Sequence, residues 1–381
     1  MDLEFSEEEA ELRDNVRTVL SGICPPAVVR GVYDGKADPT CVWQKMVELD
    51  WPALCLPEEY GGLGVGFLEL SIVAEELGRA TVPSPFLATV AQFAPCVREL
   101  GNGEQRERFL TRVAAGRVTG TLAVAERGRW TLDAVRTVAT PSEDGGWLLT
   151  GEKDSVFDGS SAEEVVVVAR SEAGLGAFVV PRADCTVRER EVIDPTLPVA
   201  DLILDGVVVP ADRVLGPPGA TGVDRSLSRV LEEATVALAM AAVGTCRVIF
   251  ETTLAYAKVR EQYGRPIGSF QALKHRLADM FLAVERATSL CYFAALTIAE
   301  EDPRRTEAAS LAKVAVGDCQ RLVVGEGLQL HGGIGFTWEH DLHFLLKRAK
   351  ACDAMFGNAL SHRSRLASTL GLALPDDGAA A

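Results

Sequence analysis

From Asp224 almost to its end, the sequence keeps a helical pattern that is broken most strongly at Gly264-Arg-Pro266. Apolar residues recur there at helical spacing, which predicts helices near 226–262, 270–299, 304–330 and 340–353, with one more after Asn358. The lengths of these helices and their short connections are typical of an antiparallel four-helix bundle. We therefore expect residues 225–381 to form one helical domain.

The residues before 225 show two further sequence patterns. The pattern of residues 1–118 predicts helices. Near its start, Ser6 is followed three residues later by Glu9, which is a capping-box pattern. Residues 119–224 hold short β-branched runs between Gly, Pro and Asp residues, as in a sandwich or barrel. The runs that predict strands are 119–125, 147–150, 165–169, 177–181 and 201–209. The expected class is α+β, with an N-terminal all-α domain, a middle β-sandwich or barrel domain and the C-terminal bundle.

Composition excludes some partners. The net charge of -16 repels nucleic acid and anionic membranes, so we expect neither as a partner. The apolar run Ala234–Cys246 is too short to span a bilayer and predicts a buried core helix. Nine scattered cysteines without a C-x-x-C pair predict reduced thiols, a cytoplasmic protein and no metal site. The acidic residues 1–10 predict no signal peptide.

Two motifs in the helical part carry polar residues and glycines at helix ends. The first is Arg260-Glu-Gln-Tyr-Gly-Arg-Pro-Ile-Gly-Ser-Phe-Gln271. The second is Gln329-Leu-His-Gly-Gly-Ile-Gly-Phe336, whose glycines let a backbone approach a ligand closely. With these motifs, and with its order of helices, β domain and bundle, the chain resembles the acyl-CoA dehydrogenases over essentially its whole length.

That resemblance implies an FAD-dependent acyl-CoA dehydrogenase, which desaturates an acyl-CoA thioester between its α and β carbons, acting alone or as a subunit of a heteromeric enzyme. It implies an electron-transfer flavoprotein or a similar electron acceptor, and a homo- or hetero-tetramer. It also implies that the bundle contacts the FAD of a neighbouring subunit. The residues that match those contacts are Arg260, Gln271, Gln329, Gly332 and Gly333. Turn chemistry alone would explain the glycines and the proline, but not the whole match.

In the β domain, the two stretches that contact the flavin in this family are altered. The family's T-E-x-x-x-G-S-D reads Ala-Glu126-Arg-Gly-Arg-Trp130 in this sequence. The family's K-x-W-I-T-N-G places Ser155 where an aromatic ring wall is expected, and Phe157 where a small hydroxyl donor is expected. A phenyl group makes no hydrogen bond to a flavin, so the sequence predicts weak flavin binding in the chain's own cleft. An alternative is that Trp130 replaces the ring wall.

Desaturation needs a carboxylate that removes the α-proton while the flavin takes a hydride. The resemblance places this Glu at one of two positions, which hold Phe356 and Ala234 in this chain. Glu233 is the best remaining candidate base. However, one residue turns a side chain by about 100° on a helix, and a salt-bridged face is the alternative interpretation for Glu233.

Three interpretations therefore stay open. The chain is an active dehydrogenase that uses Glu233, or a non-catalytic partner subunit that completes a neighbour's FAD site, or a flavin oxidase or monooxygenase on the same fold. The residues that match the family are those that a subunit lends to its neighbour, whereas the altered residues are those that it would use itself. This split favours a partner subunit, as in the heteromeric acyl-CoA dehydrogenases of actinobacteria.

Overall fold

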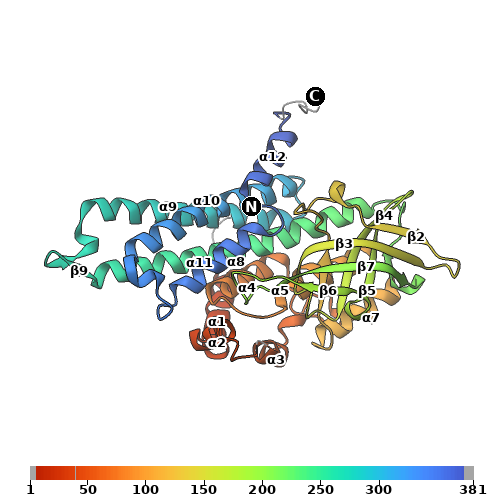
Figure 1. Cartoon of the computed structure of the whole chain (residues 1–381), viewed down its shortest axis with the longest axis horizontal. Helices are drawn as coiled ribbons and strands as arrows, with labels where there is room; N and C mark the ends of the chain where they lie inside the picture. The colour runs from red at the N-terminus through yellow and green to blue at the C-terminus, as the bar shows by residue number, and fades with distance from the viewer. Residues whose placement is uncertain (1–5, 39, 373–381) are drawn as a thin grey trace.

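The computed structural model describes residues 6–38 and 40–372 (Figure 1). It contains a helical N-terminal part, a β domain and a helical C-terminal part, as the sequence predicts. The N-terminal helices are α1 (Glu7–Ile23), α2 (Pro26–Tyr33), α3 (Thr40–Glu48), α4 (Phe67–Arg79), α5 (Phe86–Ala88), α6 (Ala94–Leu100) and α7 (Gly103–Ala114). The expected capping box opens α1, where the Glu9 amide donates to Ser6 Oγ over 3.2 Å and the Ser6 amide donates to Glu9 Oε2 over 2.7 Å.

The C-terminal part is built on one long helix that runs through the centre of the molecule (Figure 1). Its helices are α8 (Val223–Val259), α9 (Gln271–Ala299), α10 (Arg305–His331), α11 (Leu342–Ala354) and α12 (Ala359–Thr369). All residues of α8 from Glu232 to Cys246 are buried, so the predicted core helix is confirmed. Helices α9, α10 and α11 pack along α8, and α12 packs on α10.

Glycines let α8 cross the N-terminal helix α4 at close range. A Cβ atom on Gly78 would lie 1.8 Å from the carbonyl oxygen of Ala241. A Cβ atom on Gly244 would lie 2.1 Å from the carbonyl oxygen of Glu75. Because neither backbone could retreat without unpacking its helix, glycine is required on both sides of this crossing.

Helices α8 and α9 are each long and apolar enough to cross a membrane, judged by length and composition alone. In α8, 89% of the most apolar stretch is buried inside the protein, which is the behaviour of a core helix. In α9 the corresponding share is 44%, and its outer face leaves Phe281 and Leu282 exposed. An exposed apolar helix face of this kind favours contact with another protein surface.

The β domain forms one mixed sheet in the strand order β6-β7-β3-β2-β4-β5-β8, with β1 parallel to β4. Its strands are β1 (Gly120–Ala123), β2 (Val138–Pro141), β3 (Trp147–Phe157), β4 (Glu164–Ser171), β5 (Gly174–Pro181), β6 (Thr186–Glu189), β7 (Val199–Val209) and β8 (Val214–Gly216). The rings of Trp147 on β3 and Phe178 on β5 lie 5.7 Å apart, although β2 and β4 separate these strands in the sheet. The sheet therefore curls around its own apolar core, as in the barrel of the sequence expectation.

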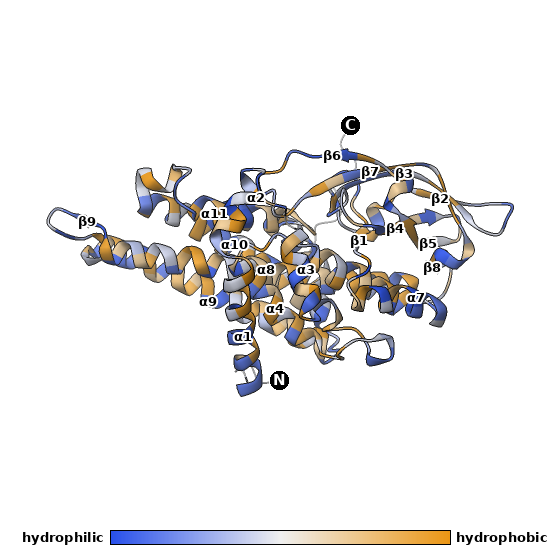
Figure 2. Cartoon of the chain, turned by 90° about the horizontal axis from the view of Figure 1, so that it is seen from below, coloured by the Kyte–Doolittle hydropathy of each residue, from blue (hydrophilic) through white to orange (hydrophobic). Residues whose placement is uncertain are grey.

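A short hairpin between α8 and α9, made of β9 (Glu261–Gln262) and β10 (Arg265–Pro266), projects beyond the bundle. It lies at the end of the molecule opposite the β domain (Figure 1). Its tip is hydrophilic (Figure 2), and Tyr263 is 93% exposed there. The break at 264–266 in the sequence is thus a turn that returns the chain into α9.

One buried cation ties the three parts together. Arg348 on α11 pairs with Asp194, which precedes β7, with 2.6 Å between Nε and Oδ2. Its Nη2 atom donates to the carbonyl oxygens of Val82 and Thr196, each over 3.2 Å. The hydroxyl of Tyr33 on α2 donates to the second oxygen of Asp194 over 3.0 Å. Arg348 and Asp194 are both almost completely buried.

Replacing Arg348 by Ala should destabilise the protein by about 3–5 kcal/mol, because the Asp194 carboxylate would remain buried without its cation. Urea unfolding followed by far-UV circular dichroism measures this loss. Arg129→Ala is the control, since Arg129 and Asp133 form an exposed ion pair whose removal should change stability by less than about 0.5 kcal/mol. Equal, small effects of the two substitutions would contradict the role of Arg348.

Candidate functional site

The polar motifs of the sequence meet at one end of the bundle, where α8 ends, α9 begins and α10 ends. A groove of about 510 Å³ lies there, and we call it the Arg260 groove. Its lining includes Tyr256, Arg260, Arg276, Gln329, His331, Gly332 and Gly333. The structure therefore brings together four of the five residues expected to bind FAD. The fifth, Gln271, opens α9 beside the groove and lies 3.3 Å from His275 Nε2, but it does not line the groove.

The Arg260 groove offers donors suited to an anion. Arg260 caps α8 through its backbone amide, and its exposed side chain has no ion-pair or hydrogen-bond partner among residues 6–38 and 40–372. Arg276 stands on the facing helix and pairs with Glu326 over 3.1 Å. Two guanidinium groups beside a glycine turn can hold a phosphate group by paired donors.

Gly332 ends α10 with a φ of 64°, in the left-handed region that glycine tolerates best. Apart from each glycine and its chain neighbours, no atom of the described residues lies within 4 Å of a Cβ built on Gly332 or Gly333, so these glycines leave open space beside the backbone. A ligand can approach that backbone closely, which is the property expected from the sequence motif.

The segment after these glycines is held by α2 of the N-terminal part. The guanidinium of Arg30 donates to the carbonyl oxygens of Trp338 over 2.7 Å and of Glu339 over 3.3 Å, and it pairs with Asp341. The indole nitrogen of Trp338 donates in return to Asp34 over 3.2 Å. The position of the glycine turn thus depends on a helix more than 300 residues earlier in the chain.

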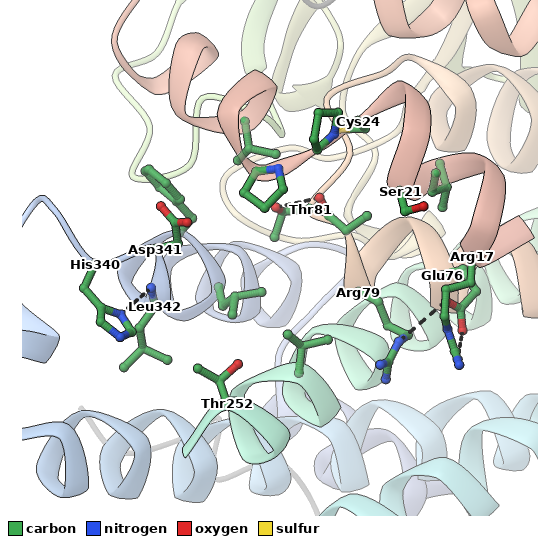
Figure 3. Close-up of a pocket in the computed structure, with 18 of the residues that line it drawn as sticks. Arg17, Ser21, Cys24, Glu76, Arg79, Thr81, Thr252, His340, Asp341 and Leu342 are labelled. Atoms are coloured by element: carbon green, nitrogen blue, oxygen red, sulfur yellow. Dashed lines mark hydrogen bonds and ion pairs between the residues drawn. The ribbon is translucent and has the colours of Figure 1, made fainter. Parts of the chain in front are cut away.

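A second cavity, of about 640 Å³, lies on the other side of this segment, between α1, α2, α4, α8 and α11. Figure 3 shows Arg17, Glu76 and Arg79 on one side of it and His340 on the other. Glu76 accepts two hydrogen bonds from Arg17, over 2.9 and 2.7 Å. None of the residues expected to bind FAD or to act as a base lines this cavity.

Glu233, the candidate base, is only 2% exposed and lies near the other end of α8. Both of its oxygens accept from Arg98, over 2.7 and 2.8 Å, and Oε1 also accepts from Arg229 over 3.1 Å. Burial lowers the pKa of Arg98, but Glu233 and Glu99 outweigh this effect and raise it above its ordinary value. These contacts do not support the expectation that Glu233 is a base, and they match the alternative of a salt-bridged face.

The side chains at the positions where the resemblance places the chain's own flavin cleft are buried in the apolar core. Phe356, at the first position expected to carry Glu, is 2% exposed and packs on Trp130 with 4.7 Å between the ring centroids. Phe157 and Ala234 are equally buried, and all four side chains belong to the main apolar core. Trp130 thus packs on the side chain that replaces the expected base. None of these four groups can accept a proton from carbon.

The loop that carries Trp130 is fixed by a buried ion pair. Lys153 Nζ lies 2.6 Å from Glu126 Oε1, and the same oxygen accepts from the hydroxyl of Thr137 over 2.7 Å. Burial lowers the pKa of Lys153 to about 8. Burial raises the pKa of Glu126, but Lys153 and Thr137 outweigh this effect and lower it overall. Glu126 therefore has a structural role, and its carboxylate already accepts hydrogen bonds from neighbouring donors.

The turn that carries Phe356 is fixed from two sides. Phe356 has a φ of 54°, an unusual left-handed conformation for a side chain of this size. Lys313 Nζ donates to the carbonyl oxygens of Cys352 and Met355 over 2.9 and 2.8 Å. His362 Nε2 donates to the carbonyl oxygen of Phe356 over 3.0 Å. These bonds hold Phe356 in the cleft.

The stability of this turn should depend on pH through His362, because burial lowers the pKa of that ring to about 4. The unfolded chain takes up the proton near pH 6.5, so between these two values it binds more protons than the native protein and the free energy of unfolding falls on acidification. His362→Gln keeps a donor for Phe356 but cannot titrate. Wild type should therefore lose more stability than His362→Gln between pH 6.5 and pH 4 in urea titrations. Parallel curves would contradict this assignment.

Comparison with known proteins shows the family. Models of the N-terminal and C-terminal domains of acyl-CoA dehydrogenases match residues 6–117 and 220–371. The acyl-CoA dehydrogenase IpdE2 of Mycobacterium tuberculosis is 31% identical over 90% of this chain and 91% of its own length. The chain belongs to the acyl-CoA dehydrogenase family, which consists of FAD-dependent oxidoreductases.

Two solved structures have the same fold. A chain of the ChsE4-ChsE5 complex from Mycobacterium tuberculosis superposes with a TM-score of 0.88 at 26% identity, covering 98% of this chain and 100% of that chain. Butyryl-CoA dehydrogenase from Megasphaera elsdenii superposes with a TM-score of 0.89 at 25% identity, covering 97% of this chain and 100% of that chain. The arrangement of helices, β domain and bundle is therefore that of the family.

Several residues that line the Arg260 groove were not predicted to bind a ligand, among them Tyr256, Arg276 and His331. Tyr256 lies one helical turn before Arg260, so the spacing of four residues could have placed both on one face. His331 lies inside the second motif, next to Gly332, whereas Arg276 is identified only by the way the helices meet. Within the described residues, no group of three or more His, Cys, Asp or Glu side chains could hold a metal ion.

Proposed function

We propose that this chain is the partner subunit of a heteromeric acyl-CoA dehydrogenase. Its Arg260 groove binds part of an FAD molecule whose reacting ring lies in a neighbouring subunit, and that neighbour supplies the catalytic carboxylate. The observation that carries this proposal is the burial of Phe356 against Trp130, at the position where the resemblance expects a base.

The distance between the groove and the cleft supports a contact between subunits. Glu233 and Ala234 lie near the start of α8, whereas Arg260 caps its end. At roughly 1.5 Å per residue, the helix separates them by about 40 Å. The groove therefore lies too far from the chain's own cleft to serve a flavin bound there. Its donors can contact a flavin whose ring is bound in a neighbouring subunit.

The residues of the groove fit such a ligand. Arg260 and Arg276 can hold pyrophosphate oxygens, and the open backbone at Gly332 and Gly333 leaves room for a nucleotide. When bound, the flavin supplies the hydride acceptor for the desaturation. The side chains of this chain bind and orient the cofactor, while Phe356 and Trp130 keep water and substrate out of the chain's own cleft.

Further features support a shared assembly. The exposed apolar face of α9, with Phe281 and Leu282, offers a surface for tetramer formation. The ChsE4-ChsE5 structure is described as a complex, which favours a hetero-tetramer for a chain of this kind. In this proposal the partner binds the acyl-CoA substrate, and electrons leave to an electron-transfer flavoprotein or a similar acceptor. The nine free cysteines favour a cytoplasmic location.

The proposal predicts how much flavin each protein carries. The chain should be purified alone and together with a family member of the same genome that keeps Glu at the position of Phe356. FAD released by denaturation is then measured per chain. We expect little FAD on the lone chain and one FAD per heterodimer in the complex. A full complement of FAD on the lone chain, bleached by acyl-CoA, would reject the proposal, and substrate-free oxygen consumption would point to an oxidase.

Glu233→Gln tests the candidate base within the complex. We expect a loss of about 1–3 kcal/mol in stability, because Arg98 and Arg229 lose the charge of their partner. Turnover per folded complex should not change. Glu232→Gln is the matched control, since the neighbouring Glu232 pairs with Arg305 over 2.7 Å in a similar setting. A loss of turnover in Glu233→Gln but not in Glu232→Gln would show that Glu233 acts as the base.

A further inference from the structure

We propose that the cavity of about 640 Å³ between α1, α2, α4, α8 and α11, the His340 cavity, binds a neutral apolar molecule with one hydrogen-bond acceptor, such as a ketone or an alcohol. This ligand is independent of the one proposed for the Arg260 groove. Three features point to its class. The walls are mainly apolar, the lining arginines already have partners, and one ring nitrogen that solvent reaches has none in the described part of the chain.

The His340 cavity has the size and the walls of a small-molecule site. Cavities that hold drug-sized ligands have volumes of roughly 300–1,000 Å³ and mostly apolar linings. The apolar lining of this cavity comes from four helices and includes Leu20, Val29, Val248, Leu342, Phe344 and Leu345. An apolar molecule that takes the place of water there removes this surface from water, which is favourable.

The two arginines on one side of the cavity are already neutralised within the chain. Arg17 donates to both oxygens of Glu76, over 2.9 and 2.7 Å. Arg79 donates to both oxygens of Glu251, over 3.3 and 2.8 Å. Glu76 is 1% exposed, so an anion that took its place would leave a buried carboxylate without its cation. These arginines therefore do not form a site for an anionic head group.

The opposite side of the cavity adds negative charge. Asp341 lines the cavity and is paired with Arg30. The carboxylate of Glu339 also lines it and has no ion-pair or hydrogen-bond partner among the described residues. An anion in the cavity would meet this charge and find no unpaired cation. The ligand is therefore expected to be neutral, which excludes free fatty acids and phosphate esters.

His340 supplies the polar contact on that side (Figure 3). Its Nδ1 accepts from the Leu342 amide over 3.1 Å, so the proton of the neutral ring is on Nε2. This Nε2 has no hydrogen-bond partner among the described residues, and it is not one of their buried unpartnered atoms, so solvent reaches it. The hydroxyl of Thr252 on α8 lines the cavity too and offers a second donor. A ketone or hydroxyl oxygen can accept from either group.

The His340 cavity shares a wall with the Arg260 groove. Residues 339–342 line the cavity, and the edge of the His340 ring lies against His331, with 5.1 Å between the ring centroids. His331 lines the Arg260 groove. A molecule in the cavity therefore contacts the segment that holds the glycine turn in place.

The dye Prodan tests the proposal on the full chain. It is an uncharged naphthalene with one ketone oxygen, and its emission shifts to the blue in apolar surroundings. We expect saturable binding to the wild-type protein, and a rise of about tenfold or more in its Kd for Thr252→Trp, because the indole fills the cavity. Thr252→Ser keeps the hydroxyl and is the matched control, with a Kd within about twofold of wild type. An unchanged Kd in Thr252→Trp would overturn the proposal.

A second variant tests the hydrogen bond. His340→Phe keeps an aromatic ring but removes the donor at Nε2. The Kd for Prodan should rise roughly fivefold to tenfold. The Kd for the 6-propyl analogue of Prodan, which lacks the ketone oxygen, should stay within about twofold. Equal changes for the two dyes would contradict the role of His340.

Two further titrations identify other occupants. The anionic naphthalene dye 1,8-ANS should not displace Prodan, and displacement at similar concentrations would overturn the assignment of a neutral ligand. Prodan should bind equally well to the assembled oligomer. Loss of binding there would show that a neighbouring subunit covers the cavity, and it would overturn the proposal as well.

A crystal structure of the wild-type chain with Prodan guards against variants that fail to fold. We expect the dye between α1, α8 and α11, with its ketone oxygen within hydrogen-bond distance of His340 Nε2 or the Thr252 hydroxyl. A dye bound only elsewhere on the molecule would reject the His340 cavity as a ligand site.

Discussion

The buried pair between Arg348 and Asp194 is the constraint on which the functional geometry depends. It fixes the middle of α11 against both the N-terminal helices and the β domain. The glycine turn of the Arg260 groove precedes α11, and the turn that carries Phe356 follows it. Because α11 has 13 residues, these two turns are about 20 Å apart. One ion pair therefore positions both the glycine turn of the Arg260 groove and the turn that carries Phe356.

The two turns have different surroundings: one lies in a filled apolar region and the other beside an open polar groove. Around the second turn, Trp130 and Phe356 bury their aromatic surface against each other, which stabilises the fold. The Arg260 groove stays open and polar, with the exposed Arg260 and the unfilled space at Gly332 and Gly333. An open polar groove far from a filled apolar region is the arrangement that the proposed partner subunit requires.

The sequence predicted the helices well because their apolar spacing is long and their breaks are strong. The bounds expected for the bundle helices agree with α8 to α11 within about three residues. The short strands β2 and β6 were not expected, since each has four residues that are mostly exposed and carry little alternation. Arg260, Gln329, Gly332 and Gly333, which the motifs single out, line one groove, and their binding of FAD stays a prediction. The sequence left Glu233 open between a base and a salt-bridged face, because its partner Arg98 lies 135 residues away in the sequence.

The proposed binding of an anionic dinucleotide to an acidic chain needs positive charge that is local rather than net. The net charge of -16 would repel FAD if it were spread evenly over the surface. Most buried or half-buried arginines are already neutralised, as Arg98 is by Glu233 and Arg348 is by Asp194. The Arg260 side chain has no such partner among the described residues. Its charge stays available at the end of the bundle, where it meets the open backbone of the glycine turn.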